Sequence, residues 1–255
     1  MKTRLAAAVR PALLSLAVSL LVLAILGLLV FYVWFPYPYD DLSNGKTLFV
    51  ILCVVTVTCG PLLTFLLFDP AKNKWKWYID VALILSLQLG AIVYGVHALA
   101  LSRPIFLAYE GDRFRVVRAA DIVEDELSQA LPEFRMIQWS GPKLIGVKLL
   151  KSTDPNYLNS LTRAVQGEHP AYRPARWVAY STQRAELVGA LKPISGLPRS
   201  QVSFGKISDL ESYTKLSDSQ LGYLPLVQHL ITDWVVIVSR EDGLPKAFLN
   251  IDGWN

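Results

Sequence analysis

Three long apolar stretches constrain this chain more than any other feature of its sequence. They cover about residues 11–35, 47–68 and 78–102, and a single acid, Asp80, is the only charge within them. Roughly 20 apolar residues in a helix span the hydrocarbon core of a bilayer. We therefore predict that residues 1–102 form three transmembrane helices. The first stretch ends in WFPYPYDD, without the small residues of a cleavage site, so we expect a retained anchor.

The charged residues are divided unevenly along the chain. Residues 1–102 contain seven Lys or Arg and four Asp or Glu, whereas residues 103–255 contain 18 and 17. The second part has the balance of an ordinary globular domain, and we predict a domain over 103–255. No basic stripe is present that would neutralise phosphates, so nucleic-acid binding is not predicted.

Basic residues near the ends of the spans predict the orientation. Short loops rich in Lys and Arg stay in the cytoplasm. Such residues precede the first span and follow the second, whereas the loop over 36–46 has one lysine and two aspartates. We expect a cytoplasmic N-terminus and an outer location for 103–255. Aromatic residues are expected at the two interfaces: Trp34, Tyr37 and Tyr39 at one, and Trp75, Trp77 and Tyr78 at the other.

Small and polar residues interrupt the second and third spans. Gly60-Pro61 lies within the second, where proline removes a helical hydrogen bond and should bend the helix. The third contains Gln88 and a small surface formed by Gly90, Ala91 and Gly95. Small residues let transmembrane helices approach closely. Two interpretations stay open: packing within a three-helix bundle, or contact with a partner's transmembrane helix.

The sequence pattern of residues 103–255 predicts an α+β domain with antiparallel hairpins. Alternating apolar residues predict a strand, a Gly-Asp turn and a strand over 103–118, and a second hairpin over 233–254 with its turn at Asp242-Gly243. Another strand is expected within 141–150. Helical spacing predicts helices over 119–131, 154–166, 178–191 and 209–216.

Residues with the chemistry of catalysis are scattered along this sequence. His169 and His229 lack companions at metal-ligand spacing, and Cys53 and Cys59 lie in an apolar span. No phosphate loop, dinucleotide fingerprint or Gly-x-Ser-x-Gly motif occurs. We predict no catalytic residue, no metal and no cofactor.

Several segments, in order, resemble type IV pilin accessory proteins of the TfpX/TfpZ kind. The resemblance covers about residues 34–114 and the last residues of the chain. Its segments are WFPYPY, CGPLLTFLLFDPAKNKWKWYID, LQLGAIVYG, RPIFLAYEGDRFRVV and FLNIDGW.

The resemblance implies a multi-pass inner-membrane protein of a Gram-negative bacterium, with its C-terminal domain in the periplasm. It implies an accessory, chaperone-like factor that binds the cognate type IV pilin and supports its stability or its assembly into pili. Pilins enter the inner membrane through an apolar N-terminal helix, so pilin, the bilayer and the pilus assembly machinery are the expected partners. The candidate contact residues are Gly60, Pro61, Gln88, Gly90, Ala91, Gly95, Arg103, Asp112, Arg113 and Phe114.

Two alternatives from other classes stay open at this point. One is a membrane-anchored enzyme that modifies pilin or envelope glycans, which would need converging acids, histidines or metal ligands in the folded domain. The other is a sensor or immunity-type membrane protein that binds an envelope ligand. The short cytoplasmic segments disfavour signal output.

Overall fold

The computed structural model describes residues 2–67, 73–197 and 207–254, and the chain divides into two compact units. We call Met1–Arg103 the membrane unit and Pro104–Asn255 the sheet unit. The boundary follows from local chemistry. Arg103 has an extended backbone (φ −63°, ψ 138°), as expected for a residue before proline, and the last helix of the membrane unit ends at Ser102.

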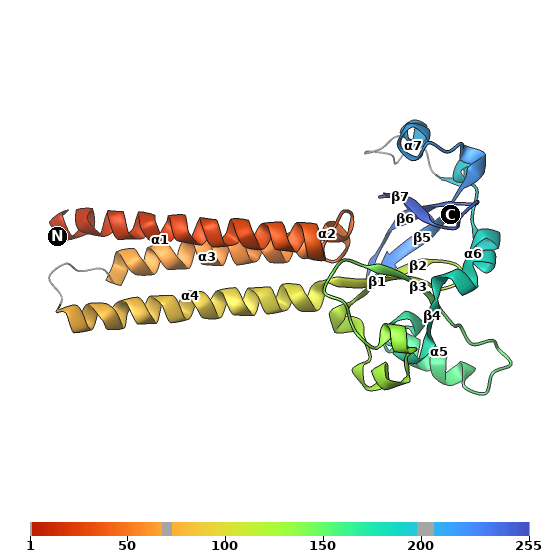
Figure 1. Ribbon diagram of the computed structural model, residues 1–255, viewed down its shortest axis with the longest axis horizontal. Coiled ribbons are helices and arrows are strands. Elements are labelled where there is room, and N and C mark those ends of the chain that lie inside the picture. The colour runs from red at the N-terminus through yellow and green to blue at the C-terminus, as the bar shows by residue number, and fades with distance from the viewer. Residues whose placement is uncertain (1, 68–72, 198–206, 255) are drawn as a thin grey trace. The chain divides into compact units, whose positions relative to one another are not determined.

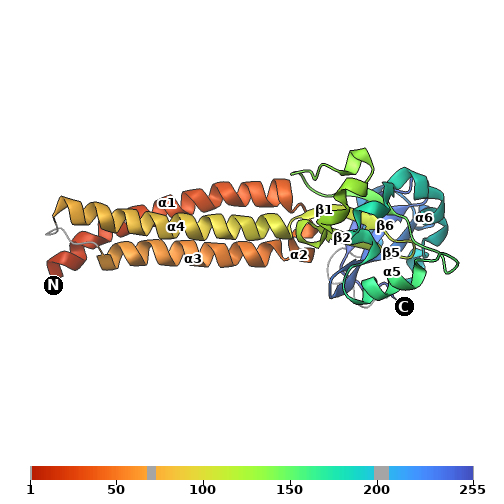
Figure 2. The same cartoon turned by 90° about the horizontal axis from the view of Figure 1, so that it is seen from below.

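Three long helices form the membrane unit (Figures 1 and 2). They are α1 (Lys2–Leu29, which continues as a π-helical segment over Val30–Trp34), α3 (Gly45–Leu67) and α4 (Lys74–Ser102), with the short α2 (Tyr39–Leu42) between the first two. The segments Ala8–Trp34, Gly45–Leu67 and Lys74–Ser102 are long and apolar enough to cross a membrane. The three predicted long apolar helices are confirmed, and each candidate span begins a few residues earlier than predicted.

Helix α3 packs against both α1 and α4. A cluster of buried side chains joins the three helices, and it includes Trp34, Leu52 and Leu99. Trp34 and Tyr39 are 5% and 6% exposed, so both side chains are covered by protein, whereas Tyr37 is 70% exposed. The aromatic belt at this interface stays a prediction. Most of the predicted turn between the second and third spans, residues 68–72, lies outside the described residues.

A seven-stranded mixed sheet forms the sheet unit, in the order β4-β3-β1-β2-β5-β6-β7. The strands are β1 (Pro104–Tyr109), β2 (Phe114–Arg118), β3 (Lys143–Val147), β4 (Trp177–Ala179), β5 (Leu221–Gln228), β6 (Ile231–Ser239) and β7 (Pro245–Leu249). Pairs β1–β2, β3–β4, β5–β6 and β6–β7 are antiparallel, whereas β1–β3 and β2–β5 are parallel. The predicted α+β class with antiparallel hairpins is confirmed.

Both predicted hairpin turns contain a glycine in the left-handed region. Gly111 (φ 82°) lies between β1 and β2, and Gly243 (φ 66°) lies between β6 and β7. Other side chains rarely adopt such backbone angles, which explains why the dipeptides Gly-Asp and Asp-Gly mark these turns.

Three helices accompany the sheet: α5 (Tyr157–Val165), α6 (Arg184–Ala190) and α7 (Ile207–Thr214). The predictions for 154–166 and 209–216 are thus close, but two others are wrong. Residues 119–131 form short 3-10 turns, which bring the buried Glu126 carboxylate to Arg173 at 2.7 Å. Only the end of 178–191 is α-helical, because Trp177–Ala179 pairs with β3 as strand β4.

Strand β5, which lies inside the sheet, was not predicted from the sequence. Pro225 argues against an inner strand, because proline lacks the N–H that a ladder needs. The pairing explains its presence. Strand β2 pairs with Leu226 and Val227 only, so Pro225 lies just before that parallel ladder begins.

Candidate functional site

Gly60 lies at a close contact between α3 and α4. A Cβ atom at this position would lie 1.7 Å from Gln88 Nε2 and 3.4 Å from Ser15 Oγ of α1. The side chain of Gln88, which is half-buried, therefore occupies the space that Gly60 leaves open. Two of the predicted partner-contact residues thus contact each other within the protein.

Gly95 makes a second contact of the same kind. A Cβ atom there would lie 2.6 Å from Leu52 Cδ1 of α3, and Ala91 is half-buried on the same side of α4. The small surface of the third span is thus used, in part, to pack α4 against α3.

Helix α3 continues through Pro61 to Leu67. The hydroxyl of Thr64 donates a hydrogen bond of 2.8 Å to the carbonyl oxygen of Gly60, one turn earlier. A bend at Pro61 stays a prediction.

Gly90 differs from the other two glycines, because, apart from the neighbouring backbone of α4, no atom lies within 4 Å of the place that its Cβ would take. It lies on an exposed flank of α4, in a row of residues spaced four, three, four and three apart. We call this row the α4 seam; it consists of Leu83, Leu87, Gly90, Tyr94 and His97.

All members of the α4 seam are exposed. Leu87 is 53% exposed and Tyr94 is 76% exposed. Alternating spacings of three and four are those with which one helix packs along another in left-handed bundles. Gly90 at the centre leaves room for a second backbone. The residues of the seam thus have the spacing at which helices pack along one another.

His97 gives the α4 seam a polar group. Within the described residues, its ring has no hydrogen-bond or ion-pair partner, and its side chain is exposed. Polar side chains in membrane helices usually face protein or a polar cavity, because leaving them in lipid is costly. His97 lies five residues before the end of α4, where it can meet a polar group of a partner or of the interface.

The predicted contact residues of the sheet unit take different positions. Asp112 and Arg113 form a two-point ion pair at the tip of the first hairpin, with both distances 2.8 Å. The Arg113 guanidinium lies 4.7 Å from the ring centre of Trp254. Phe114 is fully buried and packs against Tyr109, so it belongs to the core.

Arg103 is also largely buried, at 7% exposure, and donates a hydrogen bond of 3.1 Å to the carbonyl oxygen of Ala100. Of the four predicted residues here, only Asp112 and Arg113 present polar groups at the surface. The hydrogen bonds from Arg113 hold the pKa of the Asp112 carboxyl below its usual value, so this pair is charged at neutral pH.

A buried ion pair that was not predicted from the sequence lies within this hairpin. Arg115 and Glu110 are 4% and 6% exposed, and Arg115 Nε donates to Glu110 Oε2 at 2.8 Å. The other carboxylate oxygen accepts a hydrogen bond from the backbone N–H of Ala171 at 3.0 Å. Both carboxylate oxygens of Glu110 thus accept a hydrogen bond, as a buried carboxylate requires.

Both histidines of the sheet unit lie near this pair. His169 and His229 each contact the ring of Tyr172, over which the Arg115 guanidinium lies at 5.8 Å. His229 Nε2 lies 3.0 Å from Asp121 Oδ1. Burial lowers the pKa of the His169 imidazole, and the positive charge of Arg115 lowers it further. The fold therefore collects histidines and charges that the sequence scatters over more than 100 residues.

These groups bind one another. Burial alone would raise the pKa of the Asp121 carboxyl, but hydrogen bonds from Arg118 outweigh it and hold the pKa below its usual value. Among residues 2–67, 73–197 and 207–254, no group of three or more His, Cys, Asp and Glu is arranged to hold a metal ion.

The family model and the three relatives that match this chain are all described as fimbrial assembly proteins. A family model for fimbrial assembly protein FimB matches residues 3–44. Over 234 residues, the chain is 36% identical to a fimbrial assembly protein of serogroup I from Dichelobacter nodosus, and the match covers 90% of each chain. The serogroup E1 protein of the same bacterium is 35% identical over 233 residues, or 88% of each chain. A protein of serogroups C1 and C2 is 42% identical over 112 residues, which are 44% of this chain and 86% of that one. No solved structure matches the chain.

Proposed function

Because this chain belongs to the fimbrial assembly protein family, we propose that it is a membrane accessory protein that binds the cognate type IV pilin and supports fimbrial assembly. The observation that carries this proposal is the α4 seam. It offers an exposed row of side chains with helix-packing spacing and an open glycine at its centre.

An apolar helix is the occupant that fits this surface. The resemblance to pilin accessory proteins implies pilin as the partner. Pilins have such a helix, because an apolar N-terminal segment anchors them in the membrane. In lipid, two helices associate through close packing rather than through the hydrophobic effect. Gly90 supplies the close approach, and His97 supplies a polar contact near one end.

The contacts within the bundle refine the predicted binding face. Gly60, Gln88 and Gly95 hold α3 against α4, so their role toward pilin is to fix the seam in place. Gly90 and the exposed residues beside it make the direct contact. In the sheet unit, the exposed pair of Asp112 and Arg113 is the candidate contact for the pilin head or for another component of the pilus assembly machinery.

The proposal includes an orientation. Lys and Arg concentrate before α1 and between α3 and α4, which places both of these segments in the cytoplasm by the positive-inside rule. The sheet unit then lies in the periplasm, and the helices lie in the inner membrane. This arrangement gives the protein access to both parts of a membrane-anchored pilin.

The proposed activity is binding and not catalysis. In the relatives, the names describe assembly. The charged groups that a hydrolase or transferase would aim at its substrate are aimed here at each other, as in the pair of Arg115 and Glu110.

A photo-crosslinking amino acid at Leu87, in cells that produce the cognate pilin, tests the proposal. Leu87 lies in the α4 seam and is 53% exposed. Leu85 is a matched control, because it is 52% exposed and points to the opposite flank of α4, about 200° away. We expect pilin adducts from position 87 and few from position 85. Equal adducts at both positions, or lipid adducts alone at position 87, would show that the seam does not bind pilin.

A further inference from the structure

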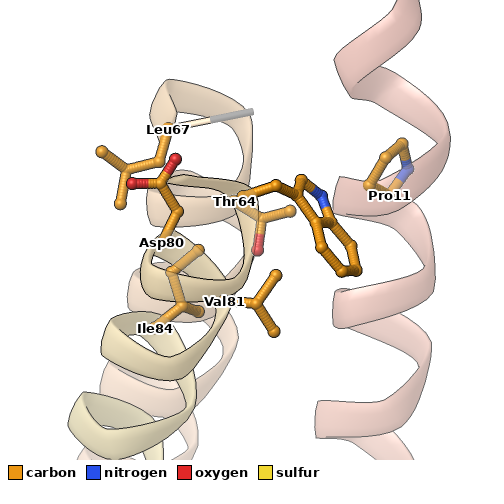
Figure 3. Close-up of a pocket in the computed structure, with 7 residues that line it drawn as sticks. Pro11, Thr64, Leu67, Asp80, Val81 and Ile84 are labelled. Atoms are coloured by element: carbon orange, nitrogen blue, oxygen red, sulfur yellow. The ribbon is translucent and has the colours of Figure 1, made fainter. Parts of the chain in front are cut away.

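A pocket of about 150 Å³ lies between α1, α3 and α4, at the end of the membrane unit that carries the start of α4 (Figure 3). Pro11 of α1 faces Thr64 and Val81 across it, and Asp80 and Leu67 lie on the far side from Pro11. Trp77 and Ile84 complete the lining. The hydroxyl of Thr64 already donates to the Gly60 carbonyl, so the lining is mainly apolar.

The size and surroundings of this pocket limit what can fill it. An apolar cavity of about 150 Å³ in another protein stays dry and binds benzene, so this pocket has room for a chain segment of about six carbons. All of its lining residues belong to the three long apolar helices. A lipid acyl chain is an apolar chain of matching width that is available at such a position.

Three basic side chains lie at the same end of the helices. Arg10 directly precedes the lining residue Pro11, and Lys76 directly precedes Trp77; Lys74 lies two residues earlier. All three side chains are exposed, and none of them forms an ion pair with another described residue. Asp80 is the one acid of the lining, so the three cations leave this end of the unit positive.

We propose that this pocket is a phospholipid site, in which one acyl chain fills the space between the helices and an anionic headgroup binds Arg10, Lys74 and Lys76. Basic residues next to a membrane helix attract anionic lipids. The acyl chain fills the space between α1, α3 and α4 at this end, and thereby fixes the spacing of the helices. The site does not depend on the proposed function, because it involves no pilin.

Native mass spectrometry of the purified full chain in detergent tests this site. The probes are dioleoyl phosphatidylglycerol, which is anionic, and dioleoyl phosphatidylcholine, which has the same chains and no net charge. We expect one phosphatidylglycerol to bind at least severalfold more tightly than phosphatidylcholine and than any further phosphatidylglycerol.

Three variants separate the chain from the headgroup. Val81→Phe fills the pocket and should abolish the tight site, whereas Val93→Phe, at an exposed position 12 residues further along α4 and about 120° around it, should retain it. The triple variant R10Q/K74Q/K76Q should bind both lipids equally. Should Val81→Phe fail to fold, Leu67→Phe fills the same pocket from α3.

Three results would overturn the proposal. They are equal affinities of the unmodified protein for the two lipids, a tight site that survives both pocket-filling variants, and a triple variant that still prefers phosphatidylglycerol. Loss of pilin copurification in Val81→Phe with unchanged lipid binding would likewise overturn it, since the pocket would then hold a partner helix.

Discussion

The sheet unit and the membrane unit are each stabilised by a different kind of internal contact. The sheet unit buries complementary charges, such as Arg115 and Glu110, within a core of apolar side chains. The membrane unit is held instead by small residues that let helices approach, as Gly60 does beneath Gln88. The membrane unit also leaves large apolar side chains exposed, including Tyr94 at 76%.

The difference follows from the solvent of each unit. In water, exposed apolar area is costly, so a globular unit hides it and pairs whatever charge is buried with it. In lipid, an exposed leucine costs nothing, and close packing decides where helices meet. A glycine on a membrane helix therefore indicates a contact. At Gly60 and Gly95 the contact is made within the protein. At Gly90 we expect a helix of a partner to make the contact.

The largest expected effect concerns the buried pair of the sheet unit. Arg115→Ala leaves the Glu110 carboxylate buried without its counter-charge, and breaking such a pair costs about 3–5 kcal/mol. Thermal unfolding of the full chain in detergent measures the loss. The control is Arg113→Ala, which breaks a surface pair with Asp112 and should cost less than about 1 kcal/mol. Equal losses in the two variants would show that burial of the pair does not matter.

A smaller loss is expected in the membrane unit from Gly60→Leu. The new side chain collides with the Gln88 amide, and overpacking of this kind costs about 1–3 kcal/mol. Gln88→Ala in the same chain makes room and should recover part of the loss. Thermal unfolding of the single and double variants gives the comparison, and an unaltered melting temperature for Gly60→Leu would show that α3 and α4 do not meet here.

A pH effect, smaller again, should come from His169. Burial and the charge of Arg115 lower the pKa of its imidazole from 6.5, so the folded protein binds this proton less readily than the unfolded chain. The contribution of His169 to stability is therefore complete above pH 6.5 and declines as the pH falls toward the folded-state pKa. His169→Gln should flatten the decline of melting temperature in that window. An identical decline in both proteins would exclude His169 as its source.

The sequence predicted the spans well, because each is a continuous signal longer than any other apolar run. It predicted both hairpins for a local reason as well, since Gly111 and Gly243 mark the turns. Strand β5 was missed because its proline argues against a strand, and only the short β2–β5 pairing shows why Pro225 is tolerated.

The candidate site was less predictable, because its parts depend on contacts between distant residues. A run of small residues in α4 indicates that another helix packs closely against it. The run does not indicate whether that helix belongs to this chain or to a partner. Only the fold separates Gly95, which meets Leu52, from Gly90, which meets nothing. The pair of Glu110 and Arg115 was likewise hidden, since Ala171, which completes it, is 61 residues from Glu110.

The smallest effect on stability, and the most direct test of the α4 seam, comes from Gly90→Leu. The new Cβ meets no atom outside the neighbouring backbone of α4, and glycine disfavours a helix by roughly 0.5–1 kcal/mol relative to alanine, so the melting temperature should stay the same or rise slightly. The decisive measurement is the amount of cognate pilin that copurifies with this variant from membranes, relative to the unmodified protein. We predict a severalfold loss of pilin from a fully folded protein. Pilin retained in full would contradict a helix-binding role for this face of α4.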